Sequence, residues 1–515
     1  MRWLALHLPA LSLEAFAATL APELRQRPLA LVAAHRIDGV DGHAAARGVR
    51  AGMRRATALA LAPDLLLAEA DAVRDAAALR ALADAALAFT PAVALHDAQT
   101  LVLEVQGSLR LFGGLAGLRG RLLDAVAPLG HRVEIAAAPT PLGAALLAQW
   151  QPPGTDLVLG PHAGDLAALR KRLAAAPLAL LGATREQLEA LQGMGLTCLA
   201  DLRRLPRAGL ARRFGDGLLT ALDRACGERS DPRRWLEPAS VFEGRIELYA
   251  RAENTDQVLH GAAVLLARLV AWAQARRARI GAFTLHMLHE RLRQAEVAPT
   301  ELRIELAEPA LALDHLQLLL RERLARCELA APTLELWLHC TDLVAAPAPN
   351  GELFPTRAGA DEGLTRLLER LCARLGEPRV QRLLPVADHR PERATRCVAA
   401  QGAAPRPGAA VAAALAAVAA SPLPLHRPAW LLPEPLPLAE RDALPLLEGR
   451  PLRLVSGPER IESGWWDGEP VARDYYIAQA ADGSLVWIFR GRLPDWPHRS
   501  ELGGAGDWHL QGRFG

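Results

Sequence analysis

One segment of this chain has the residue pattern of a phosphate-binding turn. In Leu188-Glu-Ala-Leu-Gln-Gly-Met-Gly-Leu196, Gly193 and Gly195 lie between two predicted helices, the second over Leu199–Leu205. Glycines let the backbone turn sharply, and amide N–H groups at a helix N-terminus suit a phosphate. The pattern therefore predicts a helical hairpin that can contact DNA. A helical hairpin that binds nothing is the alternative interpretation.

A second candidate is the basic cluster Arg276, Arg277 and Arg279, which follows a predicted helix and leads into a predicted strand. We expect these arginines to contact DNA phosphates. The alternative is a solvated helix end, where cations are favoured in any protein. The whole chain is close to neutral, with 59 basic and 57 acidic residues, so any DNA-binding surface must be local.

The cysteines argue against two other kinds of chemistry. The chain has six of them, far apart and without a C-x-x-C pair, which disfavours both a zinc site and a disulfide framework. A reducing, cytoplasmic setting is the default expectation. No stretch of about 18 uncharged apolar residues is expected to cross a membrane.

The elements that must position these groups begin with an alternation of strands and helices. Predicted strands cover 3–8, 93–95, 100–105 and 131–136, and predicted helices cover 12–20, 71–87, 115–127 and 141–150. This order approximates β-α-β-β-α-β, the split ferredoxin-like unit. Residues 23–64 interrupt it with a glycine-containing insertion, Gly39 to Gly52, which predicts a small subdomain.

The remainder of the 515 residues suggests several further domains, because one core cannot serve a chain of this length. Residues 166–235 are predicted to be helical, and 236–342 mix strands and helices. Residues 343–360 are predicted to be a linker, and 361–427 a helical segment followed by an Ala/Pro-rich connector. The segment 428–515 is Trp-rich and predicted to be a small β module.

Three segments together resemble the Y-family DNA polymerases. They are Trp3-Leu-Ala-Leu-His-Leu-Pro-Ala-Leu11, Gly48-Val-Arg-Ala-Gly-Met53 and Leu103-Glu-Val-Gln-Gly-Ser-Leu-Arg-Leu-Phe-Gly-Gly114. The resemblance covers about residues 1–340. It implies a multidomain α/β and α+β fold: a palm (1–22 and 65–165), fingers (23–64), a helix-hairpin-helix thumb (166–235) and a DNA-binding little finger (236–342).

The resemblance also indicates where catalytic groups would lie. The family transfers nucleotides with two divalent ions, which need hard oxygen ligands such as carboxylates. The two Asp of its first motif correspond here to His7 and Pro9, and the Asp-Glu pair of its second to Gln99 and Thr100. None of the four places a negative charge on Mg²⁺. We therefore expect no enzyme activity, no bound metal and no cofactor.

The residues that grip the triphosphate in the family are also replaced. Its fingers Tyr and Arg correspond to Gly42 and Ala45, and its palm Asn-Lys step corresponds to Thr140-Pro141. Proline cannot provide the charge of a lysine. The combined losses are typical of a non-catalytic branch.

Within that branch the chain resembles the polymerase-like subunit of a bacterial damage-induced mutagenesis complex. Gly457-Pro-Glu-Arg-Ile-Glu-Ser-Gly-Trp-Trp-Asp467 and Ala472-Arg-Asp-Tyr-Tyr476 look like the hallmark of its C-terminal extension. The resemblance implies a scaffold that binds DNA, the β sliding clamp, a RecA-like protein and an error-prone replicative-type polymerase subunit. Trp465, Trp466, Tyr475 and Tyr476 are the predicted partner-binding residues, since Trp often anchors interfaces.

A clamp-binding peptide should be short, exposed and tipped with Leu and an aromatic residue. Asn350, Gly351, Glu352, Leu353 and Phe354 form such a peptide in the linker, with Asn where Gln is usual. The alternative is an ordinary turn with Leu353 and Phe354 packed inward.

Two other functions remain open from the sequence. One is an active error-prone lesion-bypass polymerase that uses displaced carboxylates such as Asp38, Asp41, Asp97 or Glu104. The other is a protein scaffold that has lost DNA binding. Nucleotide incorporation would identify the first, and salt-dependent DNA binding would exclude the second.

Overall fold

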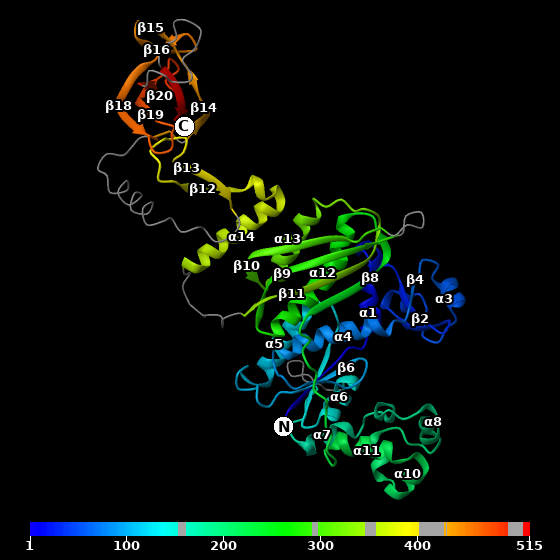
Figure 1. Cartoon of the computed structure of the whole chain (residues 1–515). Helices are drawn as coiled ribbons and strands as arrows, with labels where there is room; N and C mark the ends of the chain where they lie inside the picture. Colours follow the sequence, from blue (N-terminus) through cyan, green and yellow to red (C-terminus); the bar gives the residue numbers. More distant parts are fainter. Residues whose placement is uncertain are drawn as a thin grey trace. The chain divides into compact units, whose positions relative to one another are not determined.

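The structure is a computed structural model and describes residues 1–152, 161–290, 297–345, 357–400, 427–428, 430–492 and 508–514. It forms two compact units, Met1–Arg374 and Leu375–Gly515 (Figure 1). The division falls inside the segment 361–427 that the sequence marks as helix and connector. Each unit is described separately.

The first unit contains the predicted palm-like sheet, whose strand order is β5-β6-β1-β7. Its strands are β1 (Trp3–His7), β5 (Val93–Leu95), β6 (Thr100–Glu104) and β7 (Glu134–Ala138). Leu4 and Leu6 pack among α4 (Ala72–Leu87) and α5 (Gly114–Val126). Trp3 and Ala5, which alternate with them, belong to the core on the other face. The predicted βαββαβ unit is confirmed.

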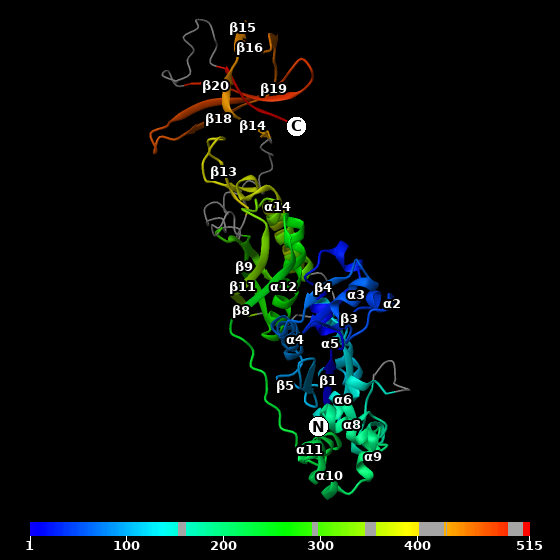
Figure 2. The ribbon, with the colours of Figure 1, turned by 90° about the vertical axis from the view of Figure 1, so that its right-hand side faces the viewer.

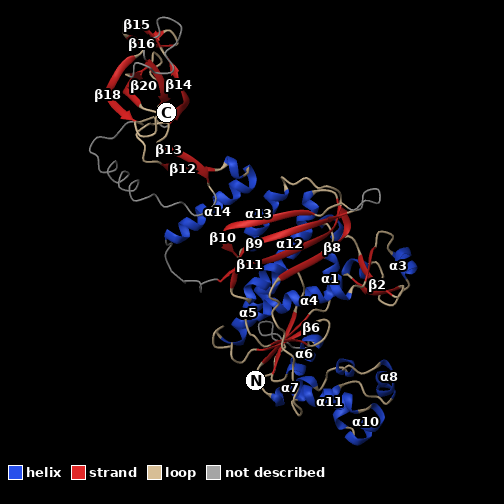
Figure 3. Cartoon of the chain, viewed as in Figure 1, coloured by secondary structure: helices blue, strands red, loops and turns tan. Residues whose placement is uncertain are grey.

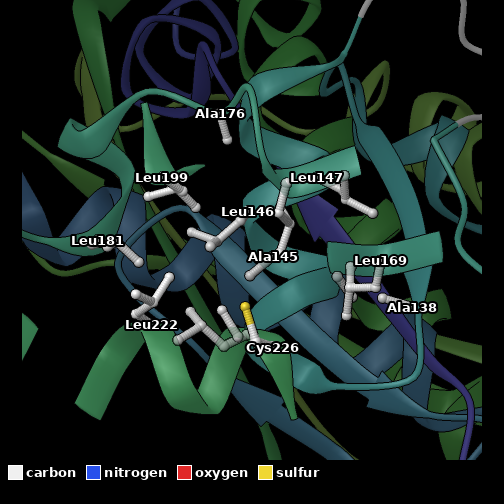
Figure 4. Packing of buried hydrophobic residues seen from close by; sticks show 14 of the residues in the cluster. Ala138, Ala145, Leu146, Leu147, Leu169, Ala176, Leu181, Leu199, Leu222 and Cys226 are labelled. Atoms are coloured by element: carbon white, nitrogen blue, oxygen red, sulfur yellow. The ribbon is translucent and has the colours of Figure 1, made fainter. Parts of the chain in front are cut away.

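The helix α6 (Pro141–Trp150) joins this second face to the thumb-like helices. Figure 4 shows Leu146 and Leu147 of α6 close to Leu169, Leu199 and Leu222. The thumb-like elements are α7 (Leu166–Leu173), η3 (Leu178–Leu181), α8 (Arg185–Gly193), α9 (Leu199–Arg204), α10 (Arg207–Phe214) and α11 (Asp216–Cys226). Palm and thumb therefore share one hydrophobic core.

The fingers-like insertion is a small α/β layer built on a sheet of order β3-β2-β4. Its elements are β2 (Leu29–Ala33), β3 (Arg36–Val40), α2 (Gly42–Ala46), α3 (Arg55–Leu61) and β4 (Leu66–Glu69). The helix α1 (Leu11–Ala17) and the turn η1 (Pro22–Gln26) connect it to the palm. Gly48 and Gly52 adopt φ of +85° and +86°, a conformation that favours glycine.

The little-finger-like part is a four-stranded sheet of order β10-β9-β11-β8. Its elements are β8 (Phe242–Ala252), α12 (Thr255–Ala275), β9 (Ala278–His289), β10 (Thr300–Ala310), α13 (Leu313–Leu324) and β11 (Thr333–Ala345). Side chains of α12 and α13 share the core of one sheet face, and Figure 2 shows α12 beside that face. The helix α14 (Arg357–Leu375) is attached through Glu369, whose carboxylate accepts from the N–H of Ala307 and lies 2.8 Å from His315 Nε2.

The helix α12 has the length and hydropathy of a membrane span, with a mean hydropathy of 1.5 over 18 residues. It is a core helix: 67% of that window is buried, and Leu265, Leu269 and Trp272 pack in the sheet core.

The second unit consists mainly of strands (Figure 3). After η4 (Glu377–Arg379), β12 (Gln381–Pro385) pairs with β13 (Thr395–Ala399). A five-stranded sheet follows, of order β14-β21-β20-β19-β18, beside a small sheet of β15, β16 and β17. The bounds are β14 (Trp430–Pro437), β15 (Ala439–Arg441), β16 (Leu444–Leu447), β17 (Arg450–Pro451), β18 (Arg453–Ser463), β19 (Val471–Gln479), β20 (Leu485–Gly491) and β21 (Trp508–Arg513). The predicted β-rich module is confirmed.

Candidate nucleic-acid interface

The ends of β1 and β6 bring the four predicted motif positions together. His7 pairs directly with Thr100 in the antiparallel register. The Leu8 N–H donates to the Gln99 carbonyl at 2.9 Å, and Pro9 lies in the turn that follows. Positions about ninety residues apart in sequence thus form one edge of the palm-like sheet, which we call the motif edge.

Hydrogen bonds among His7, Thr100, Gln149 and the carboxylate of Asp97 hold the motif edge. His7 Nδ1 lies 3.0 Å from Thr100 Oγ1. From α6, Gln149 Nε2 donates to Thr100 Oγ1 at 3.2 Å and to Asp97 Oδ2 at 2.9 Å. The other oxygen of Asp97 accepts from the Gln99 N–H at 2.8 Å. Both oxygens of this carboxylate are therefore engaged by donors of the chain.

The charges around His7 do not make a magnesium site. Burial lowers the pKa of His7, while Asp97 and Glu134 oppose the shift. Glu134 Oε1 accepts from Arg132 Nε at 3.0 Å and from Arg132 Nη2 at 2.6 Å. Among the described residues, no three His, Cys, Asp or Glu side chains gather as metal ligands. The donors at the motif edge do not fit a pair of Mg²⁺ ions, which need several carboxylate oxygens.

The displaced carboxylates considered as substitutes lie in other environments. Asp41 caps α2 by accepting from the Ala44 N–H, and it also accepts from the Leu29 N–H. Glu104 ends β6, four residues and roughly 13 Å along the strand from Thr100. Asp38 is exposed on β3 of the fingers-like sheet.

The predicted triphosphate positions have structural roles. Gly42 begins α2, and Ala45 lies within it. Thr140 is the N-cap of α6: its Oγ1 accepts from the Gly143 N–H at 3.1 Å and donates to the Ala225 carbonyl at 2.8 Å. Pro141 takes the first helical position, where its missing N–H is tolerated.

The predicted glycine hairpin is present, but its amides are engaged. Gly195 turns with φ of +78° between α8 and α9. Asp201 accepts from the N–H groups of Thr197 and Cys198, and these bonds lower the pKa of Asp201 to about 2. The amides from Met194 to Leu196 and from Leu199 to Asp201 donate to carbonyls of the chain. These amides therefore already have acceptors in the chain, and DNA contact by Gly193 and Gly195 stays a prediction.

Arginine side chains near the hairpin were missed by the sequence reading. Arg212 and Arg213 are exposed on α10, and Arg213 Nη1 lies 3.4 Å from Met194 Sδ in the hairpin turn. Within residues 166–235, described throughout, no carboxylate pairs with either arginine. This region has thirteen Arg and Lys against seven Asp and Glu, a net charge of +6, in a chain whose total is +2. A regional charge count would have identified it.

The arginines 276–279 do not form one basic patch. Arg276 lies over the Trp272 ring, 4.3 Å from its centroid, and burial lowers its pKa. Arg277 is exposed, with φ of +51° at the end of α12. Arg279 is half-buried in β9 and lines a cavity of about 240 Å³ with Glu308 and Glu369. The three side chains therefore have different environments, and their contact with DNA phosphates stays a prediction.

The sheet face opposite α12 is acidic. The register of its four strands shows which side chains share this face. Among them, the Trp337 and His286 rings are stacked with centroids 4.9 Å apart. Its charged residues are Glu243, Glu247, Glu301, Glu305, Glu335, Arg245 and Arg303. Five carboxylates against two guanidinium groups oppose binding of a phosphate backbone there.

The four predicted partner-binding residues of the second unit have different environments. Trp465 and Trp466 are 74% and 56% exposed, and Arg390 lies 5.8 Å from the Trp466 ring centroid. Tyr476 is half-buried against Trp508. Tyr475 is only 1% exposed and is stacked on Trp487 at 4.2 Å. The prediction of a surface role for Tyr475 is wrong, because its side chain belongs to the core.

The predicted clamp-binding peptide, Asn350 to Phe354, lies outside the described residues. On either side of it, β11 ends at Ala345 and α14 begins at Arg357.

Several known proteins are similar to this chain. The model of the impB/mucB/samB family matches residues 11–149. Protein ImuB from two strains of Caulobacter vibrioides is 31% identical over 497 residues, covering 91% of this chain and 100% of the relative. Among solved structures, a Dbh ternary complex is 15% identical with a TM-score of 0.39 and covers 67% of this chain and 99% of its own. DinB from Sulfolobus solfataricus is 15% identical with a TM-score of 0.36, covering 67% and 100%.

The sheet topology and the family match define the class of the palm-like part, because residues 11–149 match the impB/mucB/samB family. Because the match to the curated relatives spans nearly the whole chain at 31% identity, the chain belongs to the ImuB family.

Proposed function

We propose that this chain is a non-catalytic adaptor in damage-induced (SOS) translesion synthesis, which binds DNA and the β sliding clamp while another subunit synthesises DNA. It would act in the cytoplasm, without a cofactor and without a membrane partner. The observation that supports this proposal most is the motif edge. There His7, Pro9, Gln99 and Thr100 converge, and Gln149 engages the neighbouring carboxylate of Asp97. The group that contacts the Asp97 carboxylate from α6 is therefore a neutral amide donor and not a second carboxylate.

The thumb-like helices are the proposed DNA contact. Arg212 and Arg213 are exposed and lack carboxylate partners in their fully described region. Phosphate contacts of this kind release counterions, so DNA affinity should fall steeply with salt. A titration of a primer–template duplex over a series of salt concentrations tests this step. Absence of DNA binding at every salt concentration would favour a protein scaffold that has lost DNA binding.

Clamp binding is proposed for Asn350, Gly351, Glu352, Leu353 and Phe354. The double change Leu353→Ala, Phe354→Ala should abolish binding to the β clamp and leave DNA affinity unchanged, because apolar anchors dominate such peptides. Surface plasmon resonance on immobilised clamp measures the effect. Leu111→Ala is the control, since Leu111 is an exposed leucine of the palm-like part. Unchanged clamp affinity in the double variant would refute the assignment.

The remaining partners are proposed to be a RecA-like ImuA protein and an error-prone replicative-type DNA polymerase subunit. Trp465 and Trp466 supply an exposed aromatic pair with ring centroids 4.8 Å apart in T-shaped contact. Exposed aromatic side chains are typical interface anchors. Trp465→Ala, Trp466→Ala should weaken co-purification with one of these partners while clamp binding persists. Wild-type recovery of both partners would exclude this pair as the docking site.

A further inference from the structure

A solvent-connected cavity of about 300 Å³ lies within the first unit, between palm-like and little-finger-like helices. Glu14 of α1, Arg25 of η1 and His131 line one side. His260 and Arg268 of α12 and Gln317 of α13 line the other. The cavity is separate from the motif edge, because α1 and α4 lie on the sheet face opposite α6.

The unusual member of the lining is Arg268. Its side chain is buried, with 8% relative exposure, near the middle of the apolar helix α12. Within the described residues it has no hydrogen-bond acceptor and no carboxylate partner. Burial alone lowers its pKa to about 10, and no neighbouring carboxylate offsets that shift. A buried charge without a partner is costly, and proteins ordinarily pair such a group or neutralise it.

The other groups of the cavity leave this positive charge uncompensated. Glu14 Oε2 already accepts from the Arg132 N–H at 3.1 Å and lies 3.3 Å from His131 Nδ1. Arg25 lies at the rim: its Nε donates to the Ala17 carbonyl at 3.2 Å, and its Nη2 donates to the Ala18 carbonyl at 3.5 Å and lies 2.7 Å from His260 Nε2. Among the described residues only Nη1 of this guanidinium group has no acceptor. Burial lowers the pKa of Arg25 and of His260. Two guanidinium groups therefore face a cavity whose one lining carboxylate is engaged elsewhere.

We propose that this cavity binds a small phosphate-bearing anion, held by Arg268 and by Nη1 of Arg25. A guanidinium group donates two parallel N–H bonds to phosphate oxygens, which gives strong and directional recognition. An adjoining cavity of about 490 Å³ shares His260, Ala263 and Gln317 and leaves room for a larger group beyond the phosphate. The ligand is inorganic phosphate or a nucleoside monophosphate. By bridging α12 and η1, it would link the palm-like and little-finger-like parts.

Calorimetric titration of the full chain tests the site with three probes: inorganic phosphate, a nucleoside monophosphate and the same nucleoside without phosphate. We expect the two phosphates to bind and the nucleoside not to bind. Tighter binding of the monophosphate assigns the site to a nucleotide, and equal binding assigns it to phosphate itself. Arg268→Met should weaken binding about tenfold or more, because a charge-assisted hydrogen-bond pair is lost.

Two variants separate ligand binding from folding and from the DNA surface. Arg268→Met should not lower the thermal unfolding midpoint in phosphate-free buffer, because the change removes a buried unpaired charge. Arg212→Ala, Arg213→Ala should keep the anion affinity, which makes this test independent of the proposed DNA contact. The proposal is overturned if the wild-type chain binds neither phosphate, if Arg268→Met binds as tightly as wild type, or if it unfolds at a lower temperature without ligand.

Discussion

At the scale of single residues, adjacent side chains of similar type have opposite environments. Tyr475 donates its hydroxyl to Gln511 Oε1 at 2.6 Å and accepts from Arg473 Nη1 at 2.9 Å, and burial raises its pKa. Tyr476 is half-buried and packs on Trp508. Successive strand residues point to opposite faces, so alternation alone predicts that the two tyrosines cannot share a surface. Which face is buried depends on β20 and β21, and the local sequence does not contain that information.

The hydroxyl of Tyr475 should therefore contribute to stability. Tyr475→Phe leaves the buried Gln511 oxygen without its donor, so the free energy of unfolding should fall by about 1–3 kcal/mol. Tyr476→Phe is the matched control, with an expected change below about 0.5 kcal/mol. Urea denaturation monitored by tryptophan fluorescence measures both. Equal effects of the two changes would contradict the buried network.

The carboxylate of Asp201 is expected to make the stability of the thumb-like helices depend on pH. Its folded-state pKa, about 2, lies below the usual value because the Thr197 N–H, the Cys198 thiol and the Cys198 N–H donate to it. The stabilisation is therefore present above about pH 4 and is lost as the pH falls through about 2. Asp201→Asn should lower the thermal midpoint at neutral pH, with a deficit that shrinks below about pH 4. Asp124→Asn, on an exposed position of α5, should show no such dependence. A deficit independent of pH would contradict the role of this carboxylate.

At the scale of elements, apolar periodicity predicts the long segments well. The helix expected over 71–87 is α4, with Asp71 as its N-cap, and the helix expected over 141–150 is α6. The predicted ends of elements are wrong where contacts with residues distant in the sequence fix the backbone. The strand expected from His131 begins at Glu134, because His131 and Arg132 are held by Glu14 of α1. The hairpin of α8 and α9 is a second example. Its glycines indicate the turn, but the local sequence does not show which groups of the folded chain accept from its amides.

The element expected to contact DNA is consequently α10 rather than the hairpin backbone. Arg212→Ala, Arg213→Ala should weaken binding to any duplex and reduce the slope of log affinity against log salt by about 2, because each phosphate contact contributes close to one unit. Arg245→Ala, Arg303→Ala on the acidic sheet face is the matched control. Fluorescence anisotropy over a salt series measures the slope. An unchanged slope in the first variant, or an equal loss in the control, would place the interface elsewhere.

At the scale of the whole molecule, the order of parts could be predicted from motif resemblance, whereas the distribution of charge could not. The net charge of the whole chain is +2, whereas that of the thumb-like region is +6. The little-finger-like sheet, which the resemblance implies is part of a DNA-binding domain, has an acidic face. The spacing of Trp3–Leu11 and Leu103–Gly114 indicated the palm, and the register of β1 and β6 places their motif positions side by side. The charge of these surfaces could not be predicted from local sequence, because each surface combines residues from elements that are distant in the sequence.

The central claim is that this polymerase-related chain holds DNA without extending it. The most direct test is primer extension by the purified full chain with Mg²⁺ or Mn²⁺, beside a binding titration on the same primer–template. We expect salt-dependent binding and no nucleotide incorporation above a mock-purified control. Incorporation above that control would contradict it and would mean that carboxylates other than the residues of the motif edge support catalysis.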